Sequence, residues 1–153
     1  MLTTEMPAMT LSSDLGGVPF TDVTIPSDTG EARKVQDDIE RLIQGGLASD
    51  QEIFSVRLAL EEALVNAIKH GNQMDRTKKV RISYRLLSGR LDVRITDEGP
   101  GFDPSDVPDP TAIENLERPC GRGLMLMRHY MTEVDYVGCG NTVTMSKVFR
   151  GKK

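Results

Sequence analysis

The sequence contains no tryptophan and few other aromatic residues: four phenylalanines and three tyrosines among 153 residues. Its core must therefore consist mainly of leucine, isoleucine, valine, methionine and alanine. A chain of this length suits one domain and can bury a core without disulfides or a structural metal. Cysteine is also rare. Cys120 and Cys139 lack the pairing of a secreted scaffold and the spacing of a zinc site, so we expect free thiols in a reducing cytoplasm.

Long apolar runs, a secretory signal and a basic stripe are also lacking. The longest apolar runs fall far short of a membrane span, and the N-terminus has neither a basic start nor a continuous apolar segment. The formal net charge is −4, with lysine and arginine scattered, which argues against direct nucleic-acid binding. We therefore predict a cytoplasmic protein that contacts neither a membrane nor nucleic acid directly.

Hydrophobic periodicity divides the chain into a tail and one domain. Residues 1–19 show no periodicity, so we predict a flexible N-terminal tail followed by a domain over 20–150. Within the domain the apolar spacing predicts a strand, two helices, a hairpin, a long loop, a short helix and a second hairpin. The expected bounds are 20–25, 31–47, 51–70, 80–86, 91–96, 123–131, 133–137 and 142–148. We place the cap of the second helix at Asp50.

This order of elements indicates an α+β fold. Both strands of the first hairpin alternate apolar with polar residues, which predicts a sheet covered on one face. We expect a two-layer α/β sandwich in which a mixed, mostly antiparallel sheet carries helices on one face. The loop over 99–119 holds five of the eight prolines, and a structureless segment of that length is usually functional.

The second predicted helix carries a polar pair among apolar residues. Glu62 and Asn66 are four residues apart and share a helical face, with Lys69 and His70 near it. An interior asparagine is a poor helix former, and one reason to keep it is that its oxygen ligates a hard cation such as Mg²⁺. Glu62 can then take a proton from a nucleophile at a bound phosphate. The alternative is a solvated polar edge of an amphipathic helix.

A second group of residues, Asp97-x-Gly99-x-Gly101, follows the second strand of the first hairpin. Asp97 continues the apolar row of that strand, so parity turns it toward the helices, where a carboxylate must find donors. The exocyclic amine of adenine is such a donor. The two glycines let the backbone turn and approach a ligand closely. The alternative is a turn in which Asp97 bonds local amides.

A third group, Gly121-Arg122-Gly123, directly precedes the predicted short helix. Free N–H groups at a helix start favour an anion, and Arg122 or Arg118 can add charge against a phosphate. A flexible helix start is the alternative. The phosphate-binding sequence G-x-x-x-x-G-K-[ST] does not occur in the chain.

Together and in this order, the three groups resemble the GHKL ATPase superfamily. The run from Glu62 to Gly71 looks like its N box, Asp97-x-Gly99-x-Gly101 like its G1 box and Gly121-x-Gly123 like its G2 box. The small size and short lid are most similar to the anti-sigma factor serine/threonine kinases. This resemblance implies a Bergerat fold that binds ATP and Mg²⁺. It also implies transcription regulation by partner switching, with homodimerisation left open.

The resemblance also implies roles for individual residues. Asn66 holds Mg²⁺, Asp97 reads adenine, and a lid from roughly 102 to 120 covers the phosphates. Glu62 is the general base that activates a serine or threonine hydroxyl of an anti-anti-sigma (STAS-type) protein. After phosphorylation frees it, the kinase sequesters a sigma factor.

Two positions depart from the family's pattern, and two other functions remain open. Asn141 stands where the family often has threonine near adenine. The segment before the third group, Glu117 to Cys120, differs slightly from the family's usual form, so the resemblance leaves the phosphate role of Arg118 open. One alternative function is an ATP-gated binding module without phosphoryl transfer, which would need no base at Glu62. The other is the catalytic half of a split histidine kinase, a class that often carries lysine at the position of Lys69.

Overall fold

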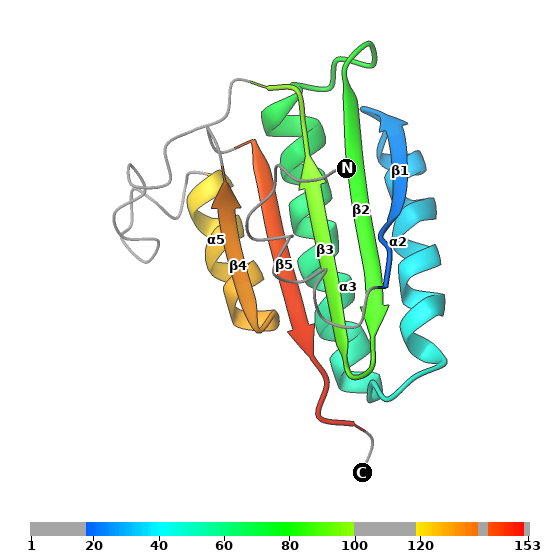
Figure 1. Ribbon diagram of the computed structural model, residues 1–153. Coiled ribbons are helices and arrows are strands. Elements are labelled where there is room, and N and C mark those ends of the chain that lie inside the picture. Colours follow the sequence, from blue (N-terminus) through cyan, green and yellow to red (C-terminus); the bar gives the residue numbers. More distant parts are fainter. Residues whose placement is uncertain (1–17, 100–118, 138–140, 152–153) are drawn as a thin grey trace.

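The computed structural model describes residues 18–99, 119–137 and 141–151, with the backbone alone for 119–124. The elements follow the order expected from the sequence, and Figure 1 shows their arrangement. Their bounds are β1 (Thr21–Pro26), α2 (Thr29–Gln44), α3 (Asp50–Val65), η1 (Asn66–Gly71), β2 (Lys79–Leu87), β3 (Arg90–Thr96), α5 (Pro119–Tyr130), β4 (Glu133–Val137) and β5 (Thr142–Val148). The predicted tail (1–19) and the predicted lid (about 102–120) lie almost entirely outside these residues.

The five strands form one open sheet in the order β1-β2-β3-β5-β4. Each of its four pairings is antiparallel, so the described sheet is antiparallel and not mixed. β2 and β3 form the predicted first hairpin and are joined by a two-residue turn, Ser88–Gly89, in which Gly89 has a positive φ of 76°. The helices lie together behind one face of the sheet (Figure 1). The protein is therefore the α+β two-layer sandwich that the sequence predicts.

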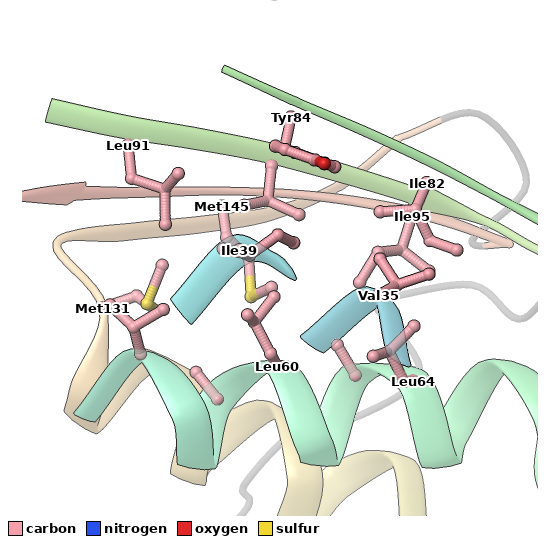
Figure 2. Packing of buried hydrophobic residues seen from close by; sticks show 14 of the residues in the cluster. Val35, Ile39, Leu60, Leu64, Ile82, Tyr84, Leu91, Ile95, Met131 and Met145 are labelled. Atoms are coloured by element: carbon pink, nitrogen blue, oxygen red, sulfur yellow. The ribbon is translucent and has the colours of Figure 1, made fainter. Parts of the chain in front are cut away.

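The core lies between the helices and the inner face of the sheet, and aliphatic and methionine side chains dominate it (Figure 2). Val35 and Ile39 of α2 and Leu60 and Leu64 of α3 point toward the strands. Burial of each such side chain stabilises the fold by roughly 1.5–3 kcal/mol. None of the described helices is both long and apolar enough to cross a membrane.

Side-chain caps fix where the two long helices begin. α2 starts after Asp28, whose carboxylate accepts two backbone N–H groups of the first turn, and this cap places the helix earlier than expected. α3 starts after Ser49, which forms a capping box with Glu52. The prediction of Asp50 as the cap was therefore wrong. Ser49 and Glu52 satisfy each other's backbone N–H, an exchange that a cap at Asp50 would lose.

The register brings several chain segments to one edge of the sheet. Thr96 at the end of β3 pairs with Thr142 at the start of β5, and Pro26 at the end of β1 pairs with Lys79 at the start of β2. This edge lies at the top of Figure 1, where the helix formed by α3 and η1 also ends. Among the described residues, the segments that carry Asn66, Asp97, Gly99 and Asn141 meet here.

Candidate functional site

The helix that carries Glu62 and Asn66 changes its hydrogen-bonding pattern between them. Glu62 lies in α3, whereas Asn66 begins η1, a π-helical segment. The amide of Asn72 bonds the carbonyl of Ala67 at 2.8 Å, a five-residue step that the wider π turn requires. The helix predicted over 51–70 therefore continues to Gly71, but its last turn is π-helical. Such π segments are rare in proteins, and many of those that occur lie at functional sites.

Asn66 is half-buried, and its two amide atoms are fully buried. Neither Oδ1 nor Nδ2 has a hydrogen-bond partner in the described structure, although both atoms are buried. An unpaired buried polar group costs about 1–3 kcal/mol, so its retention calls for an explanation, such as a ligand. An amide oxygen suits Mg²⁺, and Asn66 therefore fits the metal role. Glu62 is partly buried one turn earlier, whereas Lys69 and His70 are exposed.

Asp97 follows β3 directly, and Asn141 fixes its backbone. The amide of Asp97 donates to the carbonyl of Asn141, and Nδ2 of Asn141 donates to the carbonyl of Asp97, both at 3.0 Å. Asn141 therefore supports the position of Asp97. A direct bond from Asn141 to adenine stays a prediction.

The carboxylate of Asp97 keeps acceptor capacity for a ligand. Its Oδ1 accepts the amide of Gly99 at 2.8 Å, the only donor to this carboxylate among the described residues. Burial raises the pKa of Asp97, and the Gly99 amide and the charge of Lys78 offset this only in part. A partly desolvated carboxylate with an open oxygen suits an amine donor such as that of adenine.

Two glycines bring the Asp97 segment against the end of η1. A Cβ on Gly71 would lie 2.4 Å from Cγ and Oδ2 of Asp97, which is far inside contact distance. A Cβ on Gly99 would lie 2.1 Å from the carbonyl oxygen of Gly71. The structure thus brings together the segments that carry Glu62, Asn66, Asp97 and Gly99. The need for a glycine at position 71 was missed because no local pattern indicates that Asp97 packs against it.

The third predicted group lies inside a helix. α5 begins at Pro119, so Gly121 and Gly123 fall within it and do not precede it as expected. A proline at the first helical position costs no hydrogen bond, which explains the earlier start. The first four N–H groups of a helix lack intrahelical partners, so the backbone of Gly121 and Arg122 still belongs to the part suited to an anion. Gly101 and Arg118 lie outside the described residues.

Comparison with known proteins agrees with this fold. Residues 25–147 match the family described as histidine kinase-like ATPase domain. The chain belongs to this family, as the resemblance to the GHKL ATPases predicted.

Two curated relatives indicate to which group within this family the chain is similar in sequence. The chain is 32% identical to the serine-protein kinase RsbW of Bacillus licheniformis, over 71% of this chain and 76% of the relative. It is also 32% identical to the RsbW of Bacillus subtilis (strain 168), over 75% and 79%. The chain thus groups with RsbW-type serine-protein kinases within the family.

A solved structure shares the fold. The crystal structure of the RsbU and RsbW domains of a Mycobacterium tuberculosis protein superposes with a TM-score of 0.58 at 17% identity. The match covers 88% of this chain but only 33% of the other, much longer chain.

Proposed function

We propose that the protein is a serine/threonine kinase that binds ATP and Mg²⁺, phosphorylates a STAS-type anti-anti-sigma protein and sequesters a sigma factor in the cytoplasm. One contact carries the proposal: the carboxylate of Asp97 packs on Gly71, at the end of the helix that carries Glu62 and Asn66. In this proposal the contact brings Asp97, which would read adenine, to the helix that carries the proposed metal ligand Asn66 and the proposed base Glu62. Serine-protein kinase is also the activity named for the Bacillus relatives.

Nucleotide binding is divided among three segments. Asp97 accepts the exocyclic amine of adenine beside Gly99, with Gly101 and Asn141 completing this end of the site. Asn66 supplies an oxygen to Mg²⁺, which when bound neutralises phosphate charge. Lys69 and the first turn of α5, with the N–H groups of Gly121 and Arg122 and the positive charge of Arg122 and the preceding Arg118, would hold the phosphates.

Phosphoryl transfer then needs one base. The partner's serine or threonine oxygen forms a bond to the γ-phosphorus as the bond to the β-phosphate oxygen breaks, and the hydroxyl proton passes to Glu62. Positioning and charge neutralisation supply most of the catalysis. The new phosphate adds negative charge to the partner and weakens its complex with the kinase, which is then free to bind a sigma factor.

Transfer of labelled γ-phosphate from ATP to purified STAS-type proteins encoded near this gene tests the proposal. Glu62→Gln should lower the transfer rate by about 10²–10⁴-fold, the usual contribution of a general base, and still bind Mg·ATP. Glu61→Gln is the matched control, because Glu61 is the adjacent carboxylate, is exposed, and should change little.

Each other result points to a different conclusion. Transfer that is unchanged in Glu62→Gln would reject Glu62 as the base. ATP binding without transfer to any STAS-type protein would instead support an ATP-gated binding module. Unaltered Mg·ATP affinity in Asn66→Ala would reject the metal-binding role of Asn66.

A further inference from the structure

We propose that Asn72 is a positioning residue of the nucleotide site. It fixes the peptide that follows Asp97 to the end of the helix that carries Asn66. The inference rests on the proposed nucleotide site and adds a residue that acts through the protein backbone.

Asn72 is completely buried directly after η1, and its side chain joins three segments of the chain. Nδ2 donates to Oγ of Ser27 at 2.9 Å and to the carbonyl of Lys79 at 3.0 Å. Oδ1 accepts the backbone N–H of Glu98 at 2.8 Å. These partners lie after β1, at the start of β2 and after β3. A buried amide that uses both donor hydrogens and its acceptor specifies one arrangement of the segments around it.

The peptide between Asp97 and Glu98 is held from both sides by asparagine side chains. Its N–H donates to Oδ1 of Asn72, and its carbonyl accepts Nδ2 of Asn141. Because this peptide begins at the Cα of Asp97, its orientation determines the direction in which the carboxylate leaves the backbone. Asn72 therefore determines the direction of the Asp97 carboxylate through the backbone, without contacting that carboxylate.

Asn72 also fixes the position of the Asp97 carboxylate relative to the rest of the nucleotide site. Its neighbour Gly71 packs against the Asp97 carboxylate, so adjacent residues fix the side chain and the following peptide of Asp97 relative to η1. Asn66 begins that same helical segment. A displacement of about 1 Å in a site of this kind can cost on the order of 100-fold in activity.

The test compares Asn72→Ala with Ser27→Ala, a control on the other side of the same buried network. Ser27 is 1% exposed, accepts from Asn72 and donates to the carbonyl of Lys78, but it has no bond to Glu98. Titration calorimetry would measure the Kd of each variant for Mg·ATP and Mg·GTP. Hydrogen exchange would report the protection of the Glu98 amide, and urea denaturation the stability.

The role predicts different results for the two variants. Asn72→Ala should bind Mg·ATP about ten-fold more weakly, lose preference for ATP over GTP, and exchange the Glu98 amide faster. Ser27→Ala should lose stability and keep nearly normal ATP affinity. Asn72→Asp retains an acceptor for Glu98 and should restore much of the lost affinity. If Asn72→Ala does not fold, Asn72→Ser replaces it, because a serine hydroxyl is too short to reach Glu98.

Two results would overturn the inference. One is wild-type ATP affinity and selectivity in folded Asn72→Ala or Asn72→Ser; the other is equal weakening in Ser27→Ala. In either case ATP binding that is weakened in Asp97→Asn would show that the proposed nucleotide site stands. Absence of ATP binding by the wild-type protein would instead refute the proposed function, and the role of Asn72 with it.

Discussion

The Cα of Gly71 packs directly against the carboxylate of Asp97. A Cβ at position 71 would lie 2.4 Å from Cγ and Oδ2 of Asp97, so an alanine there must displace the carboxylate or the end of η1. We expect Gly71→Ala to lose about 1–3 kcal/mol of stability through overpacking. Its affinity for Mg·ATP should fall by roughly ten-fold or more, because misplacement affects the adenine contact directly. Calorimetry with ATP and urea denaturation measure the two effects.

Gly46→Ala is the matched control for this substitution. A Cβ on Gly46 would meet only ordinary contacts, at 3.7 Å from the carbonyl of Ile43 and 3.9 Å from Leu86. It should leave ATP affinity unchanged. Equal ATP affinity in Gly71→Ala and the wild-type protein would show that the close packing on Asp97 does not position the carboxylate.

Two asparagines at the two ends of η1 should respond oppositely to removal of the side chain. Both amide atoms of Asn66 are buried and have no partner among the described residues, so without nucleotide we expect Asn66→Ala to be more stable by about 1 kcal/mol. Asn72 has three buried bonds, and Asn72→Ala should lose about 2 kcal/mol or more. Urea denaturation of the apo proteins gives both values.

Added Mg·ATP should then make the wild-type protein more stable than Asn66→Ala. A ligand stabilises the folded state by RT ln(1 + [L]/Kd), so Mg·ATP at a concentration that saturates only the wild-type protein should raise the wild-type midpoint and hardly move that of Asn66→Ala. A loss of apo stability in Asn66→Ala would indicate that its amide is satisfied in the folded protein and serves a structural role.

Alternation along the strands made the sheet predictable, because each side-chain direction follows from a period of two. The bounds of β4 and β5 match the sequence-based expectation. The same parity turned Asp97 toward the helices, and the structure places its carboxylate against Gly71. The parts of the site that depend on local periodicity could thus be inferred from the sequence.

The remaining features depend on tertiary contacts, which no local pattern encodes. The π turn of η1 closes on Asn72, whose side chain is fixed by segments far away in the sequence. The left-handed residues after this turn are Gln73 and Met74, with φ of 54° and 61°, and neither is a glycine. Glycine is needed at position 71 for space, a reason visible only once Asp97 is placed beside it.

The raised pKa of Asp97 predicts that ATP binding depends on pH. Burial raises this pKa above its ordinary value of 3.8, and the Gly99 amide and Lys78 counteract the shift only in part. The ionised carboxylate is the better acceptor for adenine, so affinity should rise as pH increases through the raised pKa. Apo stability should change the other way. Between the ordinary and raised pKa values the folded protein retains a proton that the unfolded chain has lost, so stability falls as pH rises.

Asp97→Asn separates this effect from the titration of ATP itself. The wild-type protein and Asp97→Asn share every other titrating group. The ratio of their ATP affinities, measured as a function of pH, therefore reports the ionisation of Asp97 alone. Parallel profiles down to about pH 4, near the ordinary pKa of aspartate, would show that ionisation of Asp97 does not contribute to binding.

The outer face of the sheet contains a buried ion pair that should matter for stability. Arg85 of β2 donates through Nε to Asp92 of β3 at 3.1 Å, and their side chains are 0% and 4% exposed. Val18 and Phe20 cover the guanidinium, through a 2.9 Å hydrogen bond to the Val18 carbonyl and a ring centroid 4.4 Å from Cζ. Removal of one partner from a buried pair leaves an uncompensated charge, so Asp92→Ala should lose about 3–5 kcal/mol.

Asp22→Ala provides the comparison, because Asp22 bonds Ser83 on exposed parts of β1 and β2. It should change stability by less than about 1 kcal/mol, as exposed polar pairs usually do. The double variant Arg85→Met/Asp92→Leu should recover much of the loss, since apolar side chains remove the buried charge altogether. Urea denaturation measures all three. Equal, small losses of stability in Asp92→Ala and Asp22→Ala would mean that Arg85 reaches solvent in the folded protein. Val18 and Phe20 would then not keep its guanidinium buried.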